Sequence, residues 1–161
     1  MKMSDTPAVT VETVIKADPE RVYEIVSDLD AMASFGTEFQ KGEWVTGRPG
    51  AVGSTFRGRQ RLGDTEWETI STVTTAEPGR EFAWVVGDVD NTTAEWTLRL
   101  RGVPNGTEVG YDFVHGPGPS GLRDRIAAHP DDESKYIEGR LAMLQENMVK
   151  TLEGVRRRTS R

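Results

Sequence analysis

The chain has 161 residues, of which 35% are hydrophobic and 29% are charged, and its formal net charge is -6. This length suffices for one domain with a substantial core, and the absence of cysteine excludes disulfides and thiol chemistry. The negative charge argues against general binding to nucleic acids or anionic membranes, and no apolar run approaches the ~18–20 residues of a membrane-spanning helix.

Residues 1–7 lack the apolar segment of a secretion signal, so we expect a loose N-terminal tail and a cytoplasmic protein. Residues 1–161 are expected to form one domain. Alternation over residues 9–16 predicts a first strand. Asp18 and Pro19 then suit the N-cap and first position of a helix, and residues 28–35 predict a second short helix or turn.

Residues 43–115 follow a period of two, which predicts about six further strands. We expect them at residues 43–45, 54–62, 65–75, 82–86, 94–100 and 109–115. The links are too short for helical crossovers, so the sheet should be antiparallel. Gly63 and Asp64 suit a two-residue hairpin turn, which would pair Leu62 with Thr65 and place opposite charges face to face on the outer side.

Residues 131–158 carry apolar side chains at steps of three and four, the stripe of an amphipathic helix. Acidic residues stand in its first turn and arginines in its last, which suits the helix dipole. At ~1.5 Å per residue the helix is ~37 Å long and needs a large surface to pack on. Residues 116–130, rich in Gly and Pro, should hold one or two helical turns, as a lid or as an ordinary connection.

Four motifs carry a resemblance to a known family over nearly the whole chain. They are residues 17–30 (ADPERVYEIVSDLD), Trp67 with Glu77-Pro78-Gly79-Arg80, Trp96 with Gly106-Thr107-Glu108-Val109, and Arg140 with Asn147-Met148 and Thr151-Leu152. In this order they resemble the START-like, or SRPBCC, superfamily, and within it the bacterial polyketide cyclase/dehydrase and lipid-transport group.

The resemblance implies an α+β helix-grip fold. In this fold a curved antiparallel sheet of about six to seven strands wraps around the long C-terminal helix, and two short helices follow the first strand. It also implies a deep cavity between sheet and helix. Different members use that cavity to carry lipids and other hydrophobic molecules or to cyclise aromatic rings, and others serve in protein contacts.

The strand phases and the helix stripe predict which side chains would line such a cavity. Those from the sheet are Phe56, Gln60, Trp67, Thr69, Ser71, Trp84, Trp96, Tyr111, Phe113 and His115, and those from the helix are Tyr136, Ile137, Arg140, Leu141, Leu144 and Met148. For any single aromatic member, a place in a solid core is favoured over a place in a cavity wall. The polar members favour a wet or ligand-filled cavity, because a dry core rarely accepts so many polar groups without partners.

His115 and Tyr111 are the candidate catalytic residues. A histidine at the end of the last strand suits general acid–base chemistry near neutral pH, and the alternative is a rim histidine bonded to the backbone. Asp112 is predicted to point outward, so it would not partner His115. Arg140 either reaches an anionic ligand or pairs with Glu133 or Glu138 on its own helix.

We expect no metal and no cofactor, because two distant histidines and no cysteine leave only scattered carboxylates as ligands. The main prediction is a protein that binds a hydrophobic or aromatic small molecule. A polyketide cyclase/aromatase or dehydratase using the same cavity is the first alternative, and a protein-interaction module is the second. We expect a monomer or homodimer that neither binds nucleic acid nor inserts into membranes.

Overall fold

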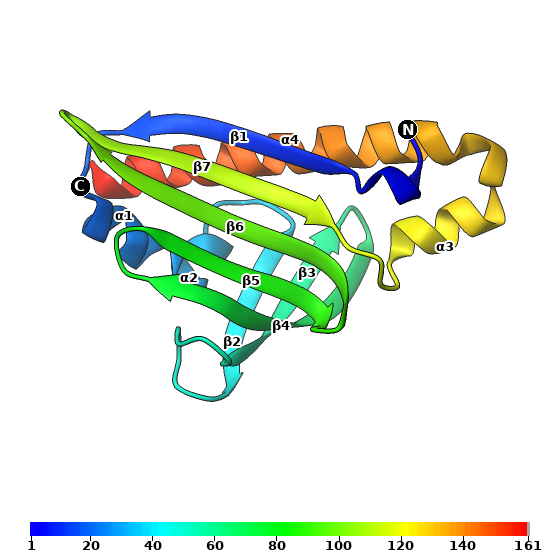
Figure 1. The fold of residues 1–161 in the computed structure, drawn as a ribbon, viewed down its shortest axis with the longest axis horizontal. Coiled ribbons are helices and arrows are strands. Elements are labelled where there is room, and N and C mark those ends of the chain that lie inside the picture. Colours follow the sequence, from blue (N-terminus) through cyan, green and yellow to red (C-terminus); the bar gives the residue numbers. More distant parts are fainter. Residues whose placement is uncertain (161) are drawn as a thin grey trace.

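A seven-stranded antiparallel sheet and one long helix dominate the computed structural model, which describes residues 1–160 (Figure 1). The strands lie in the order β1-β7-β6-β5-β4-β3-β2. Their bounds are β1 (Ala8–Ile15), β2 (Phe39–Thr46), β3 (Thr55–Leu62), β4 (Thr65–Glu77), β5 (Glu81–Asp88), β6 (Asn91–Val103) and β7 (Gly106–His115). The helices are α1 (Pro19–Val26), α2 (Leu29–Ala33), α3 (Gly121–Ala128) and α4 (Glu133–Thr159), with short 3-10 turns η1 (Met3–Asp5) and η2 (Pro130–Asp132). The predicted α+β helix-grip fold is confirmed.

The β3–β4 hairpin has the predicted register. Leu62 pairs with Thr65 across Gly63-Asp64, and the φ of 61° at Gly63 is the left-handed value that such a turn requires. Strand β2 is longer than the predicted residues 43–45. A register shift between Phe39 and Lys41 interrupts its alternation, so a period of two could not locate its start.

The first residues dock onto the start of α4, which differs from the expected loose tail. Met3 is only 7% exposed, and its backbone N–H donates to Glu133 Oε2 at 2.9 Å. The terminal amino group bonds to Ser134 Oγ at 3.1 Å. Burial of one methionine and these two contacts offset the entropy of ordering so short a segment.

The helices cover different parts of one face of the sheet. Helix α4 lies along β1, α2 lies against β2, and α1 contacts the ends of β5, β6 and β7. In Figure 1, α4 runs behind β1 and β7, while the strands from β5 to β2 curve away from it. No helix in residues 1–160 is both long and apolar enough to span a bilayer.

Two apolar clusters form on this helix-facing side. The larger one joins α4 and α1 to β1, β6 and β7 and includes Leu98, Val109 and Met148, each at most 1% exposed. The smaller one contains Leu29, Phe56, Val73 and Phe82 on the β3–β5 half of the sheet. Leu29 of the smaller cluster also lines the groove described next.

Candidate functional site

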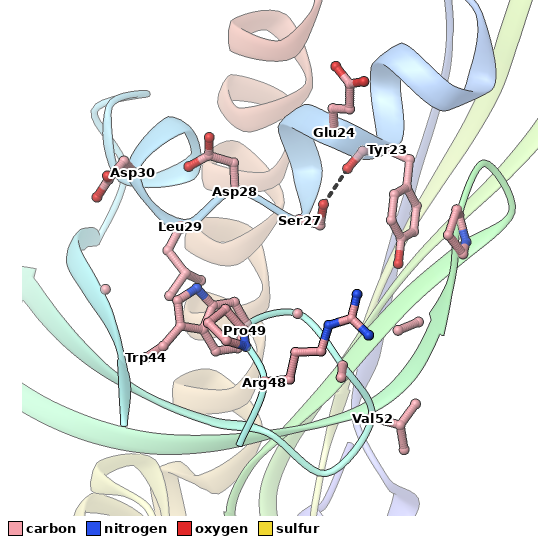
Figure 2. A pocket seen from close by; sticks show the side chains of 15 residues that line it. Tyr23, Glu24, Ser27, Asp28, Leu29, Asp30, Trp44, Arg48, Pro49 and Val52 are labelled. Atoms are coloured by element: carbon pink, nitrogen blue, oxygen red, sulfur yellow. Dashed lines mark hydrogen bonds between the residues drawn. The ribbon is translucent and has the colours of Figure 1, made fainter. Parts of the chain in front are cut away.

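A groove with a volume of about 750 Å3 lies between the two short helices and the β2–β3 loop (Figure 2). Its walls come from three regions. The α1–α2 region contributes Tyr23, Glu24, Ser27, Asp28, Leu29 and Asp30, and strand β2 with the loop after it contributes Gly42, Trp44, Arg48, Pro49, Gly50, Ala51 and Val52. The region of the β4–β5 turn contributes Ala76 and Pro78. Protein pockets for small molecules measure ~300–1,000 Å3. The groove is therefore large enough for a small-molecule ligand.

The α1–α2 junction forms one wall through local hydrogen bonds. Asp28 caps α2 by accepting a bond from the Ala31 N–H at 3.1 Å. The Ser27 hydroxyl donates to the Tyr23 carbonyl at 2.7 Å, as the dashed line in Figure 2 marks. These bonds turn the chain sharply, so that Leu29 is buried in the floor while the Tyr23 ring faces the groove.

The β2–β3 loop forms the opposite wall, and its glycines set its course. Gly47, Gly50 and Gly53 have φ values of 77°, 82° and 88°, which other residues rarely adopt. The Gly53 N–H donates to the Val73 carbonyl at 2.8 Å, which ties the loop to β4. In Figure 2 the Arg48 side chain extends from this loop toward the phenol of Tyr23.

Two rings that line the groove, Trp44 and Tyr23, contact buried rings of the sheet that do not line it. Trp44 meets Phe56 edge-on with ring centroids 5.4 Å apart, and Tyr23 meets Phe82 at 5.9 Å. Phe56 and Phe82 both contact Trp84, at 6.3 and 5.7 Å. The groove therefore stands above an aromatic cluster that extends toward the centre of the sheet.

From Trp84 the rings continue across the sheet as a row of direct cross-strand neighbours. Trp84 pairs with Trp96, and Trp96 pairs with Phe113. The two indoles stack with centroids 6.2 Å apart and an interplanar angle of 14°, and Trp96 lies 4.8 Å from Phe113. Both indoles stay partly exposed in the middle of their strands, so the helices leave this part of the face incompletely covered.

The structure brings some of the predicted cavity residues together and separates others. Ring contacts join Phe56, Trp84, Trp96, Tyr111, Phe113 and His115. Gln60 bonds to Thr69 at 3.4 Å and pairs with Trp67, and Ser71 lies opposite Phe56. Leu144 is buried in the larger core cluster with Ile137 and Met148 also buried on α4. None of the predicted cavity residues lines the groove, and a cavity beside the long helix stays a prediction.

Tyr136 faces α3 rather than the sheet. Its ring lies 4.1 Å below the Arg125 guanidinium and 6.3 Å from the ring of His129. The segment before α3 is attached to β6, because the Gly118 N–H donates to the Thr92 carbonyl at 2.7 Å. Tyr136 thus holds α3 against the start of α4.

His115 is buried, with 7% exposure, and its ring is bonded on both sides. Nδ1 lies 2.9 Å from the Gly116 carbonyl, which can only accept, so Nδ1 carries the proton. Nε2 lies 3.3 Å from Ser120 Oγ. Burial lowers the pKa of His115, and the positive charges of Arg123 and Arg140 lower it further. The imidazole is therefore neutral at physiological pH, and no carboxylate bonds to it within the described chain.

Tyr111 is buried beside Trp96, with 6% exposure. Burial raises the pKa of its phenol far above the ordinary value. The phenol therefore keeps its proton at neutral pH, which excludes a role as a general base and leaves that of a hydrogen-bond donor.

Arg140 pairs with Glu38, a partner that the sequence did not indicate. Its Nη1 and Nη2 lie 2.6 and 2.7 Å from the two carboxylate oxygens, and Asn147 Nδ2 donates to the same carboxylate at 3.0 Å. The expected partners Glu133 and Glu138 are not used. Glu38 lies between α2 and β2, where no periodic pattern predicts the direction of its side chain. Its carboxylate occupies the two guanidinium nitrogens of Arg140 that an anionic ligand would need.

Sequence reasoning missed the groove residues as a group. The available signal was the spacing of Gly47, Gly50 and Gly53, because closely spaced glycines indicate a loop whose course needs positive φ values. No cluster of three or more potential metal ligands occurs among residues 1–160.

A sheet gripping a C-terminal helix, with a groove on its helix-facing side, defines a helix-grip protein. A model of the family described as polyketide cyclase / dehydrase and lipid transport matches residues 6–153, and the chain belongs to this family. No curated protein sequence matches the chain.

Several solved structures share the fold. The polyketide-cyclase-like protein Cgl2372 from Corynebacterium glutamicum is 26% identical, with a TM-score of 0.68, over 94% of this chain and 90% of that one. The Zhui aromatase/cyclase from Streptomyces sp. R1128 is 17% identical, with a TM-score of 0.72, over 96% and 93%. The di-domain aromatase/cyclase StfQ of the steffimycin pathway is 12% identical, with a TM-score of 0.77, over 98% and 52%. At these identities the last two establish the fold alone.

Proposed function

We propose that the protein binds a hydrophobic or aromatic small molecule, of lipid or polyketide-like character, in the groove above the aromatic cluster. The observation that carries this proposal is the groove of about 750 Å3 lined by Trp44 and Tyr23, whose rings pack on the buried Phe56 and Phe82. Aromatic walls provide large apolar area and favourable ring geometry for a flat ligand.

The predicted cavity residues extend the same proposal toward the centre of the sheet. Trp84 and Trp96 are partly exposed. Trp84 contacts Phe56, the ring on which Trp44 of the groove packs, and Trp96 stacks on Trp84. A ligand that covers ~100 Å2 of apolar surface there gains about 2.5 kcal/mol. Membership in a family described by cyclisation, dehydration and lipid transport supports a ligand of this class.

Native mass spectrometry of protein purified from its own host tests the proposal. We expect an added mass that organic extraction removes and that returns when the extract is added back. As a second measurement, titration with fluorescent fatty acids and polyphenols should change the tryptophan emission in a saturable manner. Small-molecule binding would be refuted if no co-purified mass were found and no probe were taken up saturably.

Turnover of the bound molecule is the second candidate function, because two solved structures with this fold are named aromatase/cyclases. This chemistry would need a molecule held beside His115 and Tyr111, in the predicted cavity and outside the groove, which neither residue lines. There the neutral Nε2 of His115 would accept a proton, and the Tyr111 hydroxyl would donate a hydrogen bond. Incubation with a linear poly-β-ketone mimic followed by product analysis tests this candidate. A His115→Gln variant that still binds the mimic and converts it at the wild-type rate would exclude the assigned role of His115.

A further inference from the structure

The charged group directed into the groove is Arg48. Figure 2 shows its guanidinium between the β2–β3 loop and the ring of Tyr23. In the described chain its side chain has no ion pair, whereas other arginines have carboxylate partners, namely Arg21, Arg57, Arg59, Arg99, Arg101, Arg140 and Arg156. Arg48 is therefore available to a ligand.

The acidic residues of the groove are directed elsewhere or are already bonded. In Figure 2 the carboxylates of Glu24 and Asp30 point away from the Arg48 guanidinium. Glu24 pairs with Arg21 at 3.3 Å, and Asp28 accepts the capping bond of α2. Of the charged side chains that line the groove, Arg48 is therefore the one that extends across it toward Tyr23.

The hydroxyl of Tyr23 supplies a second donor. Burial raises the pKa of this phenol, and the negative charge of Glu77 raises it further. The phenol therefore stays protonated, and in Figure 2 its oxygen points toward the guanidinium. Two donors that converge from opposite walls suit one acceptor group placed between them.

The loop that presents Arg48 contains an internal turn and is tied to β4 at Gly53. The Ala51 N–H donates to the Arg48 carbonyl at 3.0 Å, and the Gly53 N–H donates to β4. A Cβ on Gly47 would approach Ser54 Cα to 3.0 Å, where the φ of 77° also disfavours any side chain. These features fix the backbone from which the exposed Arg48 side chain extends.

We propose that the ligand of the groove carries a carboxylate, which the guanidinium fork of Arg48 and the hydroxyl of Tyr23 hold while the apolar body lies on Trp44 and Leu29. Arginine matches the planar geometry of a carboxylate with two parallel bonds. This inference rests on the proposed function, since it names the polar group of the ligand bound there.

A matched series of probes tests the inference separately from the proposed function. Pyrenebutyrate, pyrenebutanol and pyrenebutylamine share one apolar body and differ in charge. We expect wild-type protein to bind the acid about tenfold more tightly than the alcohol at low salt, the effect of one charge-assisted fork. In the Arg48→Gln variant the affinities for the acid and the alcohol should differ by no more than about twofold, and the affinity for the alcohol should be unchanged.

Further variants define the geometry. Arg48→Lys keeps the charge but not the two parallel hydrogen bonds of a guanidinium, so it should retain only part of the preference for the acid over the alcohol. Tyr23→Phe should lower this preference by about threefold. Arg101→Gln, on the exposed outer side of the sheet, is the control and should keep the wild-type preference. Circular dichroism verifies that each variant is folded.

Three outcomes contradict parts of the account. Equal affinity of wild-type protein for acid and alcohol, or tightest binding of the amine, would overturn the carboxylate assignment and leave the proposed function intact. An acid preference that survives Arg48→Gln would also overturn it. If none of the three probes binds, the proposed function fails and the inference fails with it.

Discussion

Two glycines of α4 occupy opposite environments. A Cβ on Gly139 would meet no atom within 4 Å, whereas a Cβ on Gly154 would overlap the buried ring of Phe35. We predict that Gly139→Ala stabilises the protein by ~0.5–1 kcal/mol through helix propensity. Gly154→Ala should destabilise it by ~1–3 kcal/mol through overpacking. Urea unfolding of both variants measures the two changes, and a gain in stability for Gly154→Ala would contradict the close α4–Phe35 contact.

These glycines also show where sequence reading ends at the residue scale. Both stand within one predicted amphipathic helix, and periodicity treats them alike. Only the position of Phe35, more than a hundred residues away in sequence, separates a packing glycine from a dispensable one. The partner of Arg140 was equally hidden from the sequence. An arginine predicts an acidic partner, but that partner, Glu38, lies outside the helix of Arg140.

Stability should depend on the protonation of His115. Its pKa is lowered in the folded state, so below pH ~6.5 the unfolded chain binds more protons. The unfolding free energy should therefore fall as the pH drops below about 6.5, until the folded-state pKa is passed. Unfolding of His115→Gln between pH 7 and 5 should show a flatter slope than wild type. The exposed His129 provides the control, and equal slopes in wild type and His115→Gln would refute the assignment.

At the scale of elements, the Arg140–Glu38 pair fastens α4 to the segment before β2. Its side chains are 24% and 11% exposed, against 69% and 42% for the surface pair Arg101–Glu108. We predict a coupling energy of ~1–3 kcal/mol for the first pair and below ~1 kcal/mol for the second. Double-mutant cycles with leucine at each position, followed by urea unfolding, measure both. A coupling for Arg140–Glu38 no larger than that of the surface pair would show that it does not fasten the helix.

An element could be predicted where neighbouring residues alone determine it, and could not where distant residues do. The β3–β4 register follows from a two-residue turn and opposite charges across it. The start of β2 and the docking of Met3 depend on a bulge and on the side chain of Glu133, which local patterns do not contain.

At the scale of the whole molecule, the fold was predictable and the groove was not. Alternation identified the inner face of each strand, and the rings from Trp84 to Phe113 do lie together. The groove, however, needs α1, α2 and the β2–β3 loop to meet at one end of the sheet. Those segments are irregular or short, and no periodicity indicates which of their side chains converge.

The central claim is that the groove binds a hydrophobic molecule, and the four tryptophans report on it directly. Trp44 lines the groove, Trp84 is one ring behind it, and Trp67 lies on the β3–β4 hairpin. The measurement is a titration of 15N-labelled protein with pyrenebutanol, in which the indole N–H signals are followed after assignment with single Trp→Phe variants. We predict that the Trp44 signal shifts most, the Trp84 signal shifts less and the Trp67 signal is unchanged. A shift confined to Trp67, or no shift at saturating probe, would contradict the account.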